Sequence, residues 1–175
     1  NYGIRNVGGR WYAYYGAIEL QTAAGGEFVY DHGRPALYRV EIASNRPELV
    51  QKAGGANIYR DWLVGADGEI AARLDLNRTD GRWTIVAGDK AIAQGADASG
   101  DISLVALGKG GGSVIYVTPD AEGQTRYYEV PLTGGQPALF APGDLVERLY
   151  VDPVSGHLLG YLNGREPKLF DPAHQ

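Results

Sequence analysis

Serine and histidine are the side chains of this sequence that could support covalent catalysis. The nearest match to the nucleophile elbow G-x-S-x-G is GGSVI (111–115), in which Ser113 lacks the second glycine. The histidines are His32 and His157, at predicted hairpin turns, and His174, near the end. Nothing in their spacing links them to a serine and an aspartate as a triad requires. We predict that Ser113 begins a strand after a loose turn and that the chain contains no catalytic residue.

Glycine-rich and acidic loops are the segments that could hold a cofactor or a metal. GKGGGS (108–113) suggests a phosphate loop, but Lys109 is followed by Gly110 instead of Ser or Thr, and no helix is predicted after it. DASGD (97–101) and DPVSG (152–156) offer carboxylates without the spacing of a calcium loop. The sequence therefore predicts a flexible hairpin at the first segment, and no cofactor and no metal.

An aromatic segment, RWYAYYG (10–16), could form a stacking platform for a ligand. Aromatic residues at alternate positions of a strand are more often packed against a neighbouring sheet. Packing is therefore the favoured interpretation. The sequence does not show which residues bind a substrate.

Composition narrows the class of protein. The 175 residues are 44% hydrophobic and 21% charged, which is ordinary for a globular chain with a core. The net charge of -5 and the lack of a basic run argue against a nucleic-acid partner. No apolar run approaches the length of a membrane span, so we expect no membrane partner. The absence of cysteine excludes disulfides and fits the cytoplasm and the periplasm equally well.

Paired turns recur along the chain and indicate what holds these segments in place. The first turn of each unit lies near Gly25–Gly26, at GADGE (65–69), near Gly110–Gly111 and near Ser155–Gly156, at steps of about 42, 43 and 45 residues. The second turns are DHGRP (31–35), NRTDG (77–81), DAEGQ (120–124) and NGREP (163–167). Each turn precedes a β-rich run. The first three units add a weaker fourth element: RPELVQKA, DKAIAQGA and GQPALFAP.

Two tight hairpins with an outer strand, repeated at a period near 43 residues, are typical of a β-propeller blade. We predict an all-β fold, a partial β-propeller of about three and a half four-stranded antiparallel blades in a single domain, 1–175. The expected blades are 11–55, 56–100, 101–146 and an incomplete one at 147–175.

The segment 61–89 shows the local chemistry of one blade. In EIAARLDL (69–76), Ile70, Ala72, Leu74 and Leu76 alternate with more polar residues, as on a half-buried strand. Asp-Gly pairs at 67–68 and 80–81 favour tight hairpins, because both residue types tolerate positive φ. We expect the carboxylates in these turns to be solvated hairpin tips, not ligands.

An arc of three or four blades leaves the faces of its terminal blades uncovered. Asn1 is not a start residue and the sequence lacks methionine, so we expect a piece of a longer protein or a processed product. The missing blades are expected upstream of Asn1. Alternatively, two copies of the chain could associate through their open blade edges and close a ring.

Two parts of the sequence resemble a known family. The segment 61–89 has the layout D-W-x-x-x-x-D-G-x-x-x-A-R, followed by a turn and G-R-W-T. The segment 149–175, LYVDPVSGHLLGYLNGREPKLFDPAHQ, has a DP-x-x-G-x-x-x-G pattern and an FDP element. Both resemble the N-terminal propeller of bacterial prolyl oligopeptidase-family serine peptidases of the acylaminoacyl- and dipeptidyl-peptidase-like branch. The resemblance extends from about Trp11 to Gln175.

The resemblance implies a non-catalytic propeller segment that limits access of peptides to a Ser-His-Asp site. Its partners would be the α/β-hydrolase catalytic domain of the same protein and a peptide substrate. The Glu-Glu pair that some dipeptidyl peptidases use to hold the substrate amino terminus is absent from this sequence. The alternative is a stand-alone protein-binding propeller, like the translocation protein TolB. In either case we expect the chain alone to hydrolyse no peptide or ester.

Overall fold

The computed structural model describes residues 1–22 and 24–171, and in this part of the chain the regular structure is almost entirely β. The exception is a short 3-10 turn at Lys109–Gly111. Fifteen strands form four separate antiparallel sheets, in which neighbours in sequence are neighbours in the sheet. The predicted all-β class is confirmed.

We call the four sheets blades 1 to 4. Blade 1 contains β1 (Gly3–Val7), β2 (Arg10–Thr22), β3 (Phe28–Glu41) and β4 (Arg46–Gln51). Blade 2 contains β5 (Ile58–Val64), β6 (Ile70–Asn77), β7 (Arg82–Ala87) and β8 (Lys90–Ala96). Blade 3 contains β9 (Ser103–Leu107), β10 (Ser113–Pro119), β11 (Thr125–Pro131) and β12 (Ala138–Leu139). Blade 4 contains β13 (Val146–Val151), β14 (Leu158–Asn163) and β15 (Glu166–Leu169). Three four-stranded blades and one three-stranded blade agree with the predicted three and a half blades.

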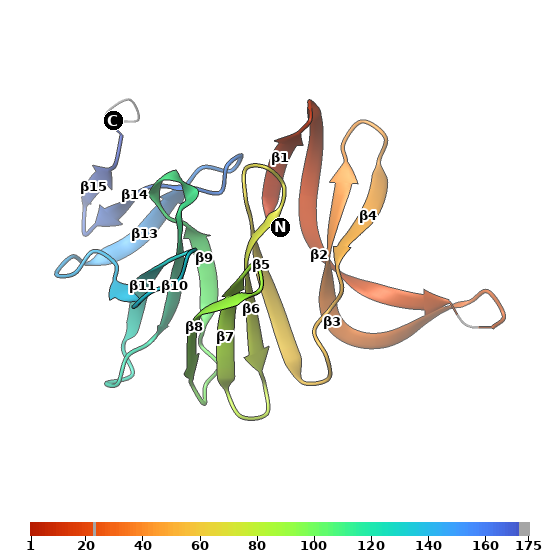
Figure 1. The fold of residues 1–175 in the computed structure, drawn as a ribbon, viewed down its shortest axis with the longest axis horizontal. Coiled ribbons are helices and arrows are strands. Elements are labelled where there is room, and N and C mark those ends of the chain that lie inside the picture. Colours follow the sequence, from red (N-terminus) through yellow and green to blue (C-terminus); the bar gives the residue numbers. More distant parts are fainter. Residues whose placement is uncertain (23, 172–175) are drawn as a thin grey trace.

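The blades follow one another in an arc, from blade 1 at the right of Figure 1 to blade 4 at the left. Their faces pack in sequence order, and each contact between neighbours has its own buried apolar cluster. The cluster between blades 1 and 2 contains Tyr12, Tyr14, Leu37, Trp62 and Val64. The cluster between blades 2 and 3 is the largest and includes Leu74, Trp83, Ile85, Val114 and Tyr116. The cluster between blades 3 and 4 is built on Ala106, Ile115 and Leu158.

Blade 1 corrects two details of the sequence prediction. Its first strand, β1, begins at Gly3 and lies outside the expected range 11–55. The segment DHGRP (31–35) is not a turn, because it lies within β3, where the register against β2 shifts between Ile18 and Leu20. The first turn of this blade is therefore Gly8–Gly9. The turn near Gly25–Gly26 is the second, at the tip of a long hairpin that projects beyond the blade (Figure 1).

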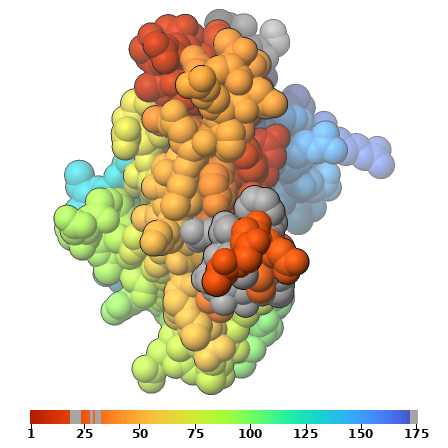
Figure 2. All heavy atoms as spheres, turned by 90° about the vertical axis from the view of Figure 1, so that its right-hand side faces the viewer, coloured from red at the N-terminus to blue at the C-terminus, as the bar shows by residue number. Residues whose placement is uncertain are grey.

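The opposite face of blade 1 is open. Because cross-strand partners lie on the same face, the pairings place a row of apolar residues on the side away from blade 2. These residues are Ile4, Trp11, Ala13, Tyr15, Tyr38, Val40 and Leu49. Figure 2 looks onto this side, where residues of blade 1 form the front of the molecule and the later blades lie behind. We call this surface the open face.

In RWYAYYG (10–16), the packing prediction is confirmed for Tyr12 and Tyr14, which are buried against blade 2, whereas Trp11 is 46% exposed on the open face. The acidic turn residues Asp67 and Asp80 are exposed, and each accepts a hydrogen bond from the backbone N–H two residues later. Their carboxylates shape the hairpins, as expected of Asx turns.

Candidate functional site: the axial pocket

The first strands of the blades meet around a pocket of about 550 Å³. Its walls come from β1, β5 and β9 and from the end of β13 with the turn that follows it. Blades 1 and 4 touch each other here, because the N–H of Ile4 lies 3.4 Å from the carbonyl oxygen of Pro153. The pocket therefore lies on the axis of the arc, and we call it the axial pocket. Its volume is in the range of pockets that take small ligands.

Arg5 on β1 holds three blades together at this axis. Its side chain is 2% exposed. The guanidinium donates to the carbonyls of Val64 and Gly65 in blade 2, at 2.7 and 2.9 Å, and to that of Pro153 in blade 4, at 3.1 Å. Burial lowers the pKa of Arg5. A charge desolvated in this way is stabilised by the carbonyl oxygens that surround it, so its role is to fix the walls of the pocket.

Asp61 and Tyr2 form the second polar feature of the axial pocket. Burial raises the pKa of Asp61, while hydrogen bonds from the Tyr2 hydroxyl and the Trp62 backbone N–H act in the opposite direction. The pKa of Tyr2 is also raised, first by burial and second by the nearby charge of Asp61. The Tyr2 ring packs edge-on against Trp62, with ring centroids 5.6 Å apart. The pair gives the pocket a hydrogen-bonding carboxyl beside two aromatic rings.

Asp152 shapes the fourth wall. Its carboxylate accepts hydrogen bonds from the Val154 N–H at 2.9 Å and the Ser155 hydroxyl at 2.7 Å. The hydroxyl bond is the main cause of the lowered pKa of Asp152. Both bonds stay within the turn between β13 and β14, and this turn carries the Pro153 carbonyl that Arg5 contacts. The sequence motif DPVSG (152–156) therefore acts as a turn, as predicted from its spacing.

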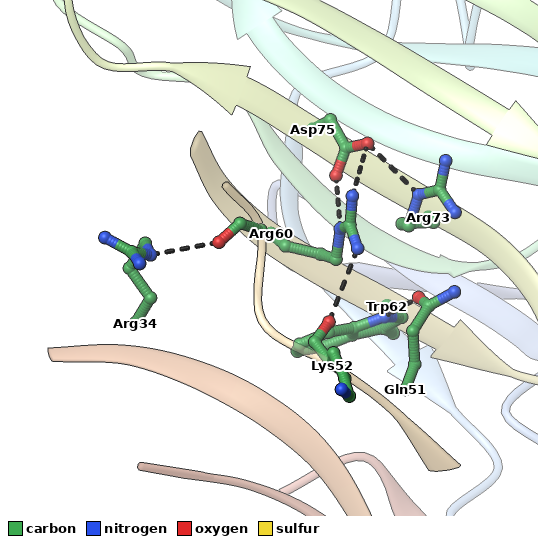
Figure 3. A network of polar contacts seen from close by, with 8 residues as sticks. Arg34, Gln51, Lys52, Arg60, Trp62, Arg73 and Asp75 are labelled. Carbon is green, nitrogen blue, oxygen red and sulfur yellow. Dashed lines mark hydrogen bonds and ion pairs between the residues drawn. The ribbon is translucent and has the colours of Figure 1, made fainter. Parts of the chain in front are cut away.

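Behind the axial pocket, a polar network joins blade 2 to the linker from blade 1 (Figure 3). Arg60 donates to both carboxylate oxygens of Asp75, at 2.6 and 3.0 Å, and to the carbonyl of Lys52 at 3.3 Å. Arg73 reaches the same carboxylate at 3.2 Å, and Trp62 donates to the Gln51 side chain. The two arginines on the Asp75 carboxylate stiffen blade 2 itself, whereas the bonds of Arg60 to Lys52 and of Trp62 to Gln51 tie this blade to the end of blade 1. This network includes Trp62 and Arg73 of the layout quoted above.

Ser113 and the histidines do not form a triad in the part of the chain that the structure describes. Ser113 is the first residue of β10, as predicted, and its hydroxyl donates to Glu129. His157 follows the turn after β13 and forms a parallel bridge with Leu107. His32 lies within β3 and not at a hairpin turn. His174 falls outside the described residues.

The remaining loop motifs also have structural roles. GKGGGS (108–113) forms the short 3-10 turn that leads into β10, and this turn does not continue into an α-helix. Asp97 accepts hydrogen bonds from the Ser99 hydroxyl and from the N–H of Asp101, so the DASGD (97–101) carboxylate closes its own turn. Among residues 1–22 and 24–171, no group of three or more metal-ligating side chains gathers around one point.

Sequence reasoning did not find Arg5, Tyr2 or Asp61. Arg5 stands in a short strand whose only cue is the pattern GIRNV, and its partners are backbone atoms far away in the sequence. Asp61 lies in the quoted D-W layout, but the sequence does not indicate that it is buried. The alternation of side chains along a strand distinguishes the two faces of one blade and does not show how neighbouring blades pack on them. A charged residue beside a buried Trp at a blade start is the signal that could have indicated it.

Within the described residues, no helix has the length and apolarity needed to cross a lipid bilayer. The sequence matches no protein-family profile, and comparisons with curated proteins and with solved structures found no similar chain.

Proposed function

We propose that this chain is the non-catalytic, substrate-gating propeller segment of a prolyl oligopeptidase-family serine hydrolase that acts on peptides. The observation that carries the proposal is the axial pocket, which joins the first strands of all four blades and is lined by Asp61, Tyr2 and Arg5. A pocket of about 550 Å³ with hydrogen-bonding groups and aromatic rings suits an unfolded peptide segment and is too small for a folded protein.

The resemblance of residues 61–89 and 149–175 to the peptidase propeller supports the family. Trp62 of that layout lies in the contact between blades 1 and 2, Arg73 pairs with Asp75 within blade 2, and Asp152 shapes a pocket wall. The residues behind the resemblance are thus structural in this chain. The family's activity would reside in a hydrolase domain joined to it.

The gene context is the first test. A downstream G-x-S-x-G motif followed by Asp and His supports the proposal. A stop codon directly after Gln175, with no hydrolase in the gene, would count heavily against it. The chain alone should release no product from an aminoacyl-nitroanilide. Turnover that a serine-directed inhibitor blocks would refute its non-catalytic role.

Gating has its own kinetic test in the parent hydrolase. Asp61→Arg changes the charge and width of the axial pocket, so kcat/KM for oligopeptides should change while kcat/KM for a small nitrophenyl ester stays constant. Asp89→Arg, in the exposed turn between β7 and β8, is the matched control and should change neither value. An equal effect of Asp61→Arg on the ester and the peptides would reject gating through this pocket.

The second candidate function is a stand-alone protein-binding propeller of the TolB kind, and the open face of blade 1 favours it. Ile4, Trp11 and Leu49 are large apolar residues exposed on that face. Apolar patches of this sort mark contact sites on proteins. A gene that encodes complete blades upstream and no hydrolase downstream would favour this candidate over the first.

A further inference from the structure

The two sides of blade 1 differ sharply in charge. Its body, residues 3–16 and 36–51, contains these charged residues: Arg5, Arg10, Arg39, Glu41, Arg46 and Glu48. The strand pairings place all of them on the side of Tyr12 and Tyr14, which packs on blade 2. Arg39 and Glu48 form an ion pair there, at 2.8 Å. The charges of this blade therefore lie on the side that already has a neighbour.

The open face has the opposite composition. Its cross-strand partners form three rows: Asn6 with Trp11; Ile4 with Ala13 and Val40; and Tyr15 with Tyr38 and Leu49. All of these side chains are uncharged, and the two tyrosine rings stack on each other, with centroids 6.1 Å apart. An antiparallel sheet with one face in water normally places its polar side chains on that face. The pattern of blade 1 is therefore that of a sheet covered on both faces.

The size of the open face limits what can cover it. Four strands about 4.8 Å apart, with a rise of about 3.4 Å per residue, give a face of about 20 by 20 Å. An area of about 400 Å² is that of a large apolar patch on a monomer. It is smaller than the roughly 800 Å² that each partner buries in a standard interface. The open face therefore suits a small contact of the weak, reversible class.

A second copy of the chain matches this surface in charge. The net charge of -5 makes two copies repel each other over most of their surface, and the uncharged open face lets them approach without opposing like charges. A two-fold contact brings the same patch of both copies together, so the patch must complement itself. An uncharged, apolar and nearly flat sheet face meets that condition.

The outward side of blade 4 is a poorer partner for the open face. The row that contains Leu149 and Tyr161 packs on blade 3. The neighbouring row of Arg148, Leu162 and Pro167 therefore points away from blade 3. Docking of this side on the open face would bury the Arg148 guanidinium against uncharged side chains, which is costly for an unpaired charge. Face-to-face pairing avoids this cost.

We propose that two copies of this chain associate through their open faces in a two-fold symmetric dimer that buries Trp11 and Leu49 of both copies. Each copy has one open face, so the contact is complete with two chains and does not extend further. This pairing joins sheet faces and not blade edges. It does not depend on the proposed hydrolase function, because it uses the side of blade 1 that faces away from blade 2.

Sedimentation velocity of the 175-residue chain, from about 1 to 200 μM, tests the pairing. Monomer should convert to dimer with a Kd in the micromolar range, as expected for a small interface. Leu49→Lys should weaken the dimer at least about tenfold, because it places an unpaired ammonium in the contact. Trp11→Lys, also at an exposed position, should do the same. Leu145→Lys is the matched control, since Leu145 is exposed on the turn between β12 and β13, and it should leave the Kd unchanged.

Several outcomes of this series would overturn the proposal. A chain that stays monomeric throughout would leave the open face to a different protein. Assemblies that grow beyond the dimer would indicate a head-to-tail contact. Equal effects of Leu49→Lys and Leu145→Lys would place the contact elsewhere.

Salt and footprinting locate the contact independently. Raising NaCl from about 0.05 to 0.5 M should leave the dimer unchanged or strengthen it, because salt screens the repulsion between the copies. Hydroxyl-radical oxidation of Trp11 should slow as the dimer forms, while that of Leu145 keeps its rate. Dissociation by salt would indicate an interface of ion pairs, and undiminished oxidation of Trp11 in the dimer would show that the open face is uncovered. Either result would reject the proposal.

Discussion

The contact between blades 2 and 3 and the open face of blade 1 have similar side chains and different surroundings. The first brings together Leu74, Trp83 and Ile85 of blade 2 with Val114 and Tyr116 of blade 3. The open face carries Ile4, Trp11, Tyr15, Tyr38 and Leu49, with no blade over them in the part of the chain that the structure describes. Both are apolar sheet faces of a repeated blade.

The difference teaches that apolar patterning alone does not decide which face is buried. In a repeat fold each unit contacts only its neighbours, so burial depends on whether a neighbour is present. The open face has the composition of a blade contact and the exposure of a surface.

The largest effect should come from the same substitution made on both faces. Leu74 is completely buried, whereas Leu49 is 42% exposed. Leu74→Ala should lower the free energy of unfolding by about 2–5 kcal/mol, because it removes buried methyl groups and leaves a cavity. Leu49→Ala should change it by less than about 1 kcal/mol. Urea unfolding measures both. Similar losses would mean that the two faces are equally buried.

A glycine pair tests the contact between blades 1 and 2. Gly68 and Gly88 both have positive φ in hairpin turns, at 84° and 57°. A Cβ at Gly68 would lie 2.6 Å from the Tyr14 hydroxyl and 2.5 Å from a Val7 methyl, but a Cβ at Gly88 would meet nothing within 4 Å. Gly88→Ala should cost only the backbone term, about 1–2 kcal/mol. Gly68→Ala should cost clearly more, as thermal unfolding would show.

The smallest effect is a pH dependence with a defined sign. The pKa of Asp61 is raised in the folded chain, so the folded state binds the proton more tightly than the unfolded state. The Asp61 contribution to stability therefore falls as pH rises from the unfolded pKa of about 3.9 to the raised folded value. Asp61→Asn should gain stability relative to the original chain over this interval and then level off.

Asp144→Asn is the control of opposite sign for that pH series. The hydrogen bond from Lys168 lowers the pKa of Asp144. Its contribution is therefore lost as pH falls through the folded pKa, and the variant should lose stability relative to the original chain as pH rises toward the unfolded pKa. Denaturant midpoints from pH 2.5 to 7 would measure both curves. Parallel curves for the two variants would contradict the burial assigned to Asp61.

The sequence predicted the class and the repeat because these depend on local patterns. Asp-Gly turns at 67–68 and 80–81 and the alternation in 69–76 fixed the strands of blade 2. The predicted turns of blade 1 were wrong in detail. Its second and third strands extend into a long hairpin, and the glycines at the tip of this hairpin resemble the first turn of a unit. Local turn chemistry does not show which hairpin of a blade a turn belongs to.

The axial pocket was beyond the sequence for a different reason. Arg5, Asp61 and Pro153 come together only through the angle between blades, which depends on packing and on bonds between blades such as those of Arg5 to Val64 and Pro153. The loops GKGGGS (108–113), DASGD (97–101) and DPVSG (152–156) do form turns, because turn formation depends on residues close together in the sequence.

The three tryptophans test the contrast between closed and open faces most directly, because each lies on a different face. Trp62 and Trp83, in the two closed contacts, are 1% and 7% exposed, whereas Trp11 on the open face is 46% exposed. Hydroxyl-radical footprinting of the dilute chain, read by mass spectrometry, should oxidise Trp11 much faster than the other two, with the difference lost in denaturant. Oxidation of Trp62 or Trp83 as fast as Trp11 in the folded chain would contradict the account.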